Sequence, residues 1–128
     1  MGGFEMVGTG NVVLDKSFCF AIRIVNVYKF LVKEHREHVL SKQLLRSGTS
    51  VGANANEAQA AQSKADFIAK MSIASKEARE TEYWIRLLIS TGYLDKKQHH
   101  VQTLLEESTE ISKLLTSIVK TAQQKERK

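Results

Sequence analysis

The sequence contains no proline and a single cysteine, Cys19, among its 128 residues. Without proline, no helix is interrupted by the residue that breaks helices most strongly. One cysteine excludes an internal disulfide framework and a zinc site built from cysteines. Its neighbours, Phe18 and Phe20, predict that Cys19 is a small buried apolar side chain. These features fit a reducing, cytoplasmic location.

A membrane span and a secretion signal are also missing from the sequence. No stretch approaches the ~20 consecutive apolar residues that cross a bilayer. The N-terminus lacks the basic and apolar regions of a signal peptide. We therefore expect a cytoplasmic protein without a membrane partner.

The charge of the chain is only mildly biased. Lysine and arginine number 19 against 14 aspartates and glutamates, which gives a formal net charge of +5. This balance permits binding to a polyanion, but it is also common where charges only keep a protein in solution. The length fits one domain that buries most of the surface exposed by its unfolded chain.

Four segments carry apolar residues at helical spacing. The first, ending near residue 35, is predicted to bury Leu14, Phe18, Ala21, Val25, Tyr28 and Val32. The second is predicted to bury the small-residue face Leu44, Gly48, Val51, Ala55 and Ala58. The third, capped by Ser63, is predicted to bury Phe67, Met71, Ala74, Ala78, Thr81, Ile85 and Leu88. The fourth is predicted to bury Val101, Leu104, Ser108, Ile111, Leu115, Ile118 and Ala122.

The connections near residues 36–40, 60–63 and 92–95 are short, which forces successive helices to run antiparallel. The expected fold class is therefore all-α, an antiparallel up-and-down four-helix bundle over residues 14–122. Asp15 or Ser17 is the candidate N-cap of the first helix. Residues 1–13 are expected to be a flexible N-terminal arm and residues 123–128 a charged C-terminal tail.

The first and third segments have more apolar residues than one buried face needs. The third carries a second stripe, offset by roughly 120° from the first, with Ile73, Trp84 and Leu87. The first carries a second stripe with Phe20, Ile24, Val27 and Leu31. Exposed large apolar groups favour a partner surface, and the commonest partner is another copy of the chain. The alternative is that these stripes widen the intramolecular core.

No group of residues predicts catalysis or a cofactor. No histidine follows a glutamate by three positions, which excludes the di-iron motif of four-helix bundles. His35 and His38 lie at a helix end, and the adjacent His99 and His100 would point to different faces. No glycine-rich phosphate loop or nucleophile–base pair is present. We expect a non-enzymatic protein with no metal, cofactor or small-molecule substrate.

Five polar residues fit a structural role where the second and third helices meet. They are Arg46, Asn54, Glu57, Glu77 and Glu80. A link between an arginine or asparagine and a carboxylate would fix the register of two helices. Removing one partner of such a buried pair would cost about 3–5 kcal/mol.

Two motifs make a family resemblance recognisable. Residues 43–54 (QLLRSGTSVGAN), followed by Glu57 and Ala58, form the first, and residues 76–84 (KEARETEYW), followed by residues 91–94 (TGYL), form the second. Together they resemble the signature of the four-helix-bundle proteins encoded in intervening sequences of bacterial 23S ribosomal RNA genes. The resemblance covers about residues 14–120.

The resemblance implies an antiparallel four-helix bundle in a bacterial cytoplasm that assembles as a ring-like homopentamer. It also implies a relation to the accessory proteins of diversity-generating retroelements, which engage nucleic acid through basic surfaces. The motif positions of the family are occupied by Arg46, Asn54, Glu57, Glu77, Glu80 and Trp84. The family supplies no catalytic role for any of them.

Two functions follow as hypotheses. In the first, an oligomer binds RNA or DNA phosphates through a basic surface, with little sequence preference and strong salt dependence. The candidate residues are Arg23, Lys29, Lys33, Arg36, Lys96 and Lys97. No aromatic platform is expected among these charges, which argues against the reading of bases. In the second, the oligomer is a protein-only scaffold without nucleic-acid binding.

Overall fold

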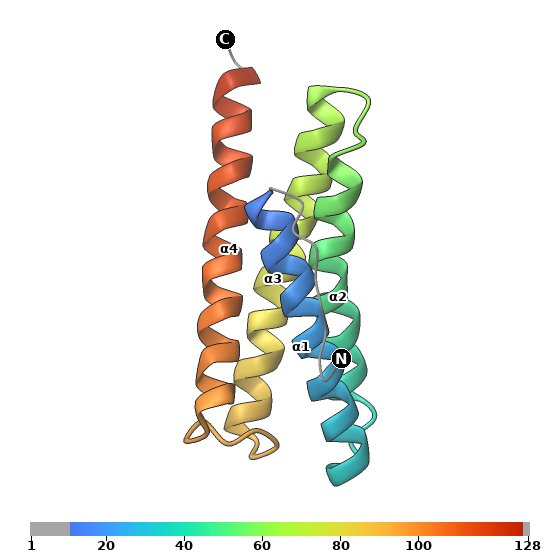
Figure 1. Ribbon diagram of the computed structural model, residues 1–128, viewed down its shortest axis with the longest axis vertical. Coiled ribbons are helices and arrows are strands. Elements are labelled where there is room, and N and C mark those ends of the chain that lie inside the picture. The colour runs from blue at the N-terminus through green and yellow to red at the C-terminus, as the bar shows by residue number, and fades with distance from the viewer. Residues whose placement is uncertain (1–10, 127–128) are drawn as a thin grey trace, which may run out of the picture.

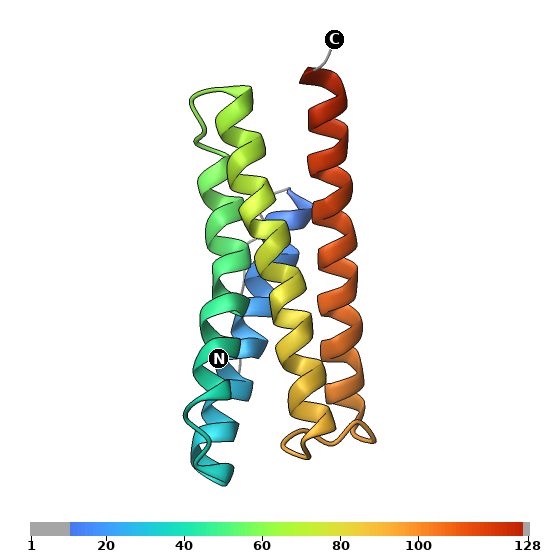
Figure 2. The ribbon, with the colours of Figure 1, turned by 180° about the vertical axis from the view of Figure 1, so that it is seen from behind.

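Four helices and their short connections make up residues 11–126, which are the residues that the computed structural model describes. The helices are α1 (Val12–His35), α2 (Leu40–Ala58), α3 (Lys64–Ser90) and α4 (His99–Glu126). Successive helices run in opposite directions along one long axis (Figures 1 and 2). Each helix packs against the next, and α1 also packs against α4. The predicted up-and-down four-helix bundle is thus confirmed, and no strand occurs within the described residues.

The buried faces of α2, α3 and α4 are the predicted ones. Every residue of the three predicted stripes is buried except Phe67 and Ile118, which are half-buried and pack against the core. Ser63 caps α3, because its side chain accepts a hydrogen bond from the backbone N–H of Asp66 at 3.0 Å. Gly92 follows α3 with a left-handed φ of 85°.

The buried face of α1 is not the predicted one. Its buried residues are Val13, Ser17, Phe20, Ile24 and Leu31. The predicted inner residue Phe18 is 52% exposed, and Cys19 is exposed rather than buried. The stripe that we had assigned to a partner surface therefore builds the core, and the widened-core alternative is correct for this helix. The residues of this stripe pack against the small residues of α2, as the close approach of Ile24 to Gly48 shows.

That surface is a notch of small residues on α2. Gly48 has no side chain, and Ile24 of α1 fills the space: an added Cβ would lie 2.7 Å from Cγ2 of Ile24. One turn along α2, a Cβ on Gly52 would lie 3.2 Å from the Ser17 hydroxyl. The two glycines therefore select the face of α1 that is buried.

The ends of the bundle also differ from expectation. Asn11 caps α1, since its side-chain oxygen accepts the N–H groups of Val13 and Leu14 at 3.1 and 3.3 Å, so neither candidate cap is used. The helix begins two residues before the predicted boundary. At the other end α4 runs through residue 126, because Gln, Lys and Glu are good helix formers. The rest of the predicted arm and tail, residues 1–10 and 127–128, lies outside the described residues.

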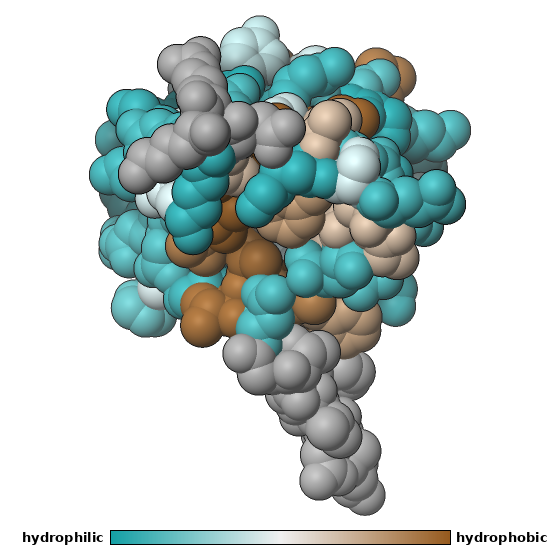
Figure 3. All heavy atoms as spheres, turned by 90° about the horizontal axis from the view of Figure 1, so that it is seen from above, coloured by the Kyte–Doolittle hydropathy of each residue, from teal (hydrophilic) through white to brown (hydrophobic). Residues whose placement is uncertain are grey.

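The first turns of α3 and the last turns of α4 extend past the start of α1 (Figures 1 and 2). Seen from above, this end of the bundle shows apolar side chains in its middle and hydrophilic ones around them (Figure 3). None of the described helices combines the length and the apolar character that crossing a membrane requires.

The start of α2 is capped by Glu37, a role the sequence pattern did not reveal. Its carboxylate accepts the backbone N–H groups of Val39, Leu40 and Ser41 at 3.1, 2.9 and 2.7 Å. Partial burial raises the pKa of this carboxyl, but these hydrogen bonds outweigh it and leave the pKa below its ordinary value. The charged carboxylate therefore stabilises the fold above the ordinary pKa of a glutamate.

Replacing Glu37 with alanine is expected to lower the free energy of unfolding by about 1 kcal/mol, the usual loss for a removed N-cap. The neighbouring Glu34→Ala, at an exposed position, is the matched control and should change stability little. Because the folded pKa of Glu37 is lowered, its contribution is lost as the pH falls through that pKa. Urea unfolding at several pH values should therefore show the wild type and Glu37→Ala converging in acid. A constant difference would contradict the charged cap.

Candidate nucleic-acid interface

Two segments distant in sequence meet at one end of the bundle. They are the C-terminal end of α1 and the connection between α3 and α4, both at the lower end in Figure 1. The rings of His35 and Tyr93 join them, with centroids 5.4 Å apart in an edge-to-face arrangement. Phe30 packs against His35 in the same way, also at 5.4 Å.

This end carries most of the predicted phosphate-binding residues, and we call the set the basic end. It consists of Lys29, Lys33, Arg36, Lys96 and Lys97, all of them exposed. Lys96 and Lys97 lie in the connection before α4 rather than on the helix, in a turn where the Asp95 carboxylate accepts the N–H of Lys97 at 2.9 Å. The carboxylates of Glu34 and Glu37 lie at this end too, but that of Glu37 accepts hydrogen bonds from backbone N–H groups at the start of α2.

Arg23 does not belong to the basic end, which corrects its assignment as a candidate phosphate ligand. Its guanidinium faces α4 and is engaged there by Glu107 at 3.1 Å, the carbonyl oxygen of His100 at 2.7 Å and the hydroxyl of Thr103 at 2.9 Å. An arginine with these partners ties α1 to α4 and has little left to offer a phosphate.

Arg36 ends α1 in a left-handed conformation, with φ 50° and ψ 33°. Its backbone N–H bonds to the carbonyl of Val32 at 3.0 Å, which closes the helix. The left-handed region is uncommon for a residue with a side chain, and glycine is the usual occupant of this position. The side chain is exposed and adds its charge to this end of the bundle.

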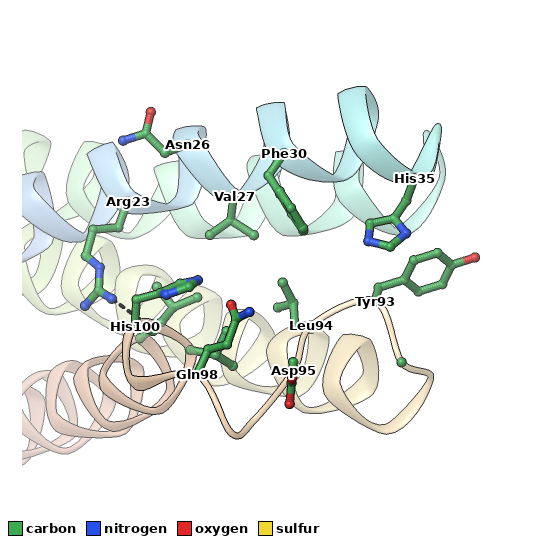
Figure 4. A pocket seen from close by; sticks show the side chains of 13 residues that line it. Arg23, Asn26, Val27, Phe30, His35, Tyr93, Leu94, Asp95, Gln98 and His100 are labelled. Atoms are coloured by element: carbon green, nitrogen blue, oxygen red, sulfur yellow. Dashed lines mark hydrogen bonds between the residues drawn. The ribbon is translucent and has the colours of Figure 1, made fainter.

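A cavity of about 390 Å³ opens within the basic end, between α1 and the connection that precedes α4 (Figure 4). Phe30 and His35 project from α1 toward this connection, which supplies Tyr93 and Gln98 (Figure 4). The apolar part of the wall consists of Val27, Leu94, Val101 and Leu104. The expectation of no aromatic groups among the basic residues was therefore wrong. Phe30 and Tyr93 are far apart in the sequence, so only the fold reveals the group.

The predicted polar contact between α2 and α3 is made by three of its five candidates. Arg46 donates to Glu77 at 2.8 Å with one nitrogen and contacts Glu80 with the other. The indole of Trp84 donates to the same Glu80 oxygen at 3.2 Å. Glu77 is only 7% exposed, whereas half of the Arg46 side chain is exposed. Hydrogen bonding from Arg46 is the main cause that lowers the pKa of Glu80.

Asn54 and Glu57 lie outside this contact. The Asn54 amide donates to the carbonyl of Ser50 on its own helix at 2.8 Å. Glu57 is exposed, and no ion pair among the described residues includes it. Both lie about two to three helical turns beyond Arg46 on α2. Because α3 runs in the opposite direction, they are level with the beginning of α3 rather than with Glu77 and Glu80.

The predicted oligomer residues on α3 share one side of the helix but differ in exposure. Ile73 is 45% exposed, whereas Trp84 and Leu87 are half-buried, with Trp84 packed against the core. Tyr83, which the sequence pattern did not single out, is 58% exposed and lies edge-to-face on Trp84. Self-association through this side remains a prediction.

No group of three or more potential metal ligands among His, Cys, Asp and Glu occurs within residues 11–126. His35 takes part in the ring contacts described above, and His100 lines the cavity.

Comparison with known proteins identifies a protein family and similar solved structures. A family model described as 23S rRNA-intervening sequence protein matches residues 10–117. A crystal structure from Bacteroides thetaiotaomicron, of a protein with unknown function from the S23 ribosomal protein family, is 61% identical with a TM-score of 0.80. That match covers 84% of this chain and 98% of the other. No curated protein matches.

Proposed function

Because this chain belongs to the 23S rRNA-intervening sequence protein family, as its two motifs predict, we propose a nucleic-acid-binding role for it. In this proposal the protein is non-enzymatic, assembles with copies of itself, and holds RNA or DNA phosphates on the basic end. Contacts to phosphates carry little sequence information, so affinity would depend mainly on charge and salt.

One observation carries this proposal. The exposed cations of the basic end come from two segments about 60 residues apart, and the His35–Tyr93 contact brings them together. Elsewhere, several basic side chains are paired with carboxylates of the same chain, as Arg23 is with Glu107 and Lys70 with Asp66. Among residues 11–126, no ion pair includes a cation of the basic end, so these charges are available to a polyanion.

Replacing four lysines of the basic end with glutamine is expected to weaken binding to a short labelled RNA at least about tenfold, because each cation releases counterions when it contacts a phosphate. These lysines are Lys29, Lys33, Lys96 and Lys97. The matched control removes the same charge from exposed lysines elsewhere, namely Lys64, Lys76, Lys113 and Lys120. Fluorescence anisotropy compares the two. Equal weakening in both variants would mean that net charge, not this end, governs binding.

Arg36→Gly separates lost binding from lost stability. Glycine adopts the left-handed conformation of residue 36 without strain, so stability should stay the same or rise by up to about 1 kcal/mol. RNA affinity should still fall, because one cation of the basic end is gone. Unchanged RNA affinity would mean that Arg36 does not contribute to phosphate binding.

The proposed self-association rests on the exposed apolar side chains of α3, Ile73 and Tyr83. Ile73→Gln with Tyr83→Gln leaves the core intact, since both positions are exposed, and is expected to lower the mass measured by light scattering. An unchanged mass would mean that self-association uses another surface.

If the wild type assembles but binds no nucleic acid, the protein-only scaffold becomes the better account.

A further inference from the structure

Resting on the proposed function, we propose that the cavity beside Phe30 takes an unpaired nucleobase of a bound single strand, while the basic end holds the neighbouring phosphates. The site would then recognise a base by stacking and amide contacts. Phosphate binding alone requires none of the groups that line this cavity.

The size and the rings of the cavity fit a planar ligand. Its volume of about 390 Å³ lies within the usual range for small-molecule sites, about 300–1,000 Å³. Phe30 is 45% exposed although it projects from α1 into the space between the two segments (Figure 4). His35 contacts Phe30 edge-to-face and is itself contacted edge-to-face by Tyr93, which leaves surface of the Phe30 ring for stacking. Unstacked bases are commonly bound on aromatic side chains in this way.

The polar groups of the cavity fit the edges of a base. Gln98 lines it from the connection before α4, and its side-chain amide makes no hydrogen bond within the described part of the chain, whereas the side chain of Asn26 on α1 points away from that connection (Figure 4). An amide offers both donors and acceptors, which the edges of all bases require. Arg23 closes the cavity toward α4 and is held in place by the His100 carbonyl at 2.7 Å (Figure 4).

The charges around the cavity fit the rest of a nucleotide. Lys33 follows Phe30 by three residues and thus lies on an adjacent part of the α1 surface. Lys96 and Lys97 directly precede Gln98 on the opposite wall. A base in the cavity would therefore have cations nearby on both segments, together with the carboxylate of Asp95, which lines the cavity.

The test compares a short single-stranded RNA with an abasic backbone of equal length, which carries the same phosphates but no bases. Wild-type protein should bind the RNA more tightly, by about 5- to 150-fold for one stacked base. Phe30→Ala should lower RNA affinity to the abasic level and leave abasic binding unchanged. The matched control is Phe18→Ala, another exposed phenylalanine of α1 that lies away from the cavity. It should change neither affinity.

Gln98→Ala, at an exposed position, is a second variant should Phe30→Ala fail to fold, and it should weaken RNA binding but not abasic binding. Equal wild-type affinity for the two probes, or RNA affinity unchanged in both variants, would overturn the base site while leaving phosphate binding intact. If the wild type binds neither probe even at low salt, the proposed function fails, and this site fails with it.

Discussion

Gly48→Ala is expected to destabilise the wild-type protein, yet to stabilise a protein in which Ile24 is already alanine. In the wild type, the new Cβ would lie 2.7 Å from Cγ2 and 3.1 Å from Cβ of Ile24, a side chain with no exposed surface. A branched side chain that is fully enclosed cannot move aside cheaply, and overpacking of this kind costs about 1–3 kcal/mol. The gain in helix propensity from glycine to alanine, about 1 kcal/mol, offsets only part of that.

In the Ile24→Ala background the two closest atoms, Cγ2 and Cγ1, are gone, and only the Cβ of residue 24 remains near the new Cβ, at 3.1 Å. The cavity left by the missing atoms lets this contact relax by the few tenths of an ångström that it needs, so most of the propensity gain remains. Ile24→Ala alone should cost about 2–5 kcal/mol, and adding Gly48→Ala should then recover up to about 1 kcal/mol. The free energies of unfolding of the four proteins form a double-mutant cycle. Gly52→Ala is the milder control, because its Cβ would meet Ser17 at 3.2 Å. Equal effects of Gly48→Ala in both backgrounds would show that Ile24 does not fill the notch.

Arg46→Met is expected to cost about 2–3 kcal/mol of stability by leaving the Glu77 carboxylate buried without its cation. Breaking a fully buried pair costs about 3–5 kcal/mol, but half of the Arg46 side chain is exposed, so water weakens the effect. Methionine keeps much of the length and the apolar stem of arginine, so the loss reports on charge and hydrogen bonds.

Glu77→Gln provides the decisive comparison for this contact. In the Arg46→Met background it removes the uncompensated charge and should restore about half of the lost stability, whereas alone it should be destabilising.

The lowered pKa of Glu80 makes the stability of this contact depend on pH, because a carboxylate with a lowered pKa stabilises the fold above its ordinary pKa and loses this effect in acid. The difference between wild type and Arg46→Met should therefore narrow as the pH falls. A difference independent of pH would mean that packing, not charge, accounts for the loss.

Helical periodicity predicts the buried face wherever a helix has one apolar stripe. For α2, α3 and α4 the predicted residues line the core. α2 and α4 offer one face with suitable spacing, and on α3 the second stripe stays at least partly exposed. For α1 the sequence offers two faces of similar apolar content. The choice between them depends on Gly48 receiving Ile24, a contact between helices that the periodicity of either one does not contain.

The polar and functional residues likewise could be predicted only where the pattern within single helices was sufficient. The contact of Arg46 with Glu77 and Glu80 could be expected, because two carboxylates one turn apart on α3 point toward α2. Glu37 was missed because it lies outside any helix and its role depends on the direction in which α2 starts. The aromatic group of the cavity was missed because α1 had been oriented by the wrong stripe, and Tyr93 lies in a connection without periodicity.

The affinity of the wild-type protein for a short labelled RNA, measured at several salt concentrations, tests the central proposal most directly. The account predicts a straight line of log affinity against log salt, with a slope of about −0.7 for each phosphate held by a single strand. Five cations per chain at the basic end would give about −3.5 if all are engaged. Absence of binding even at low salt would contradict the account and leave the protein-only scaffold in its place.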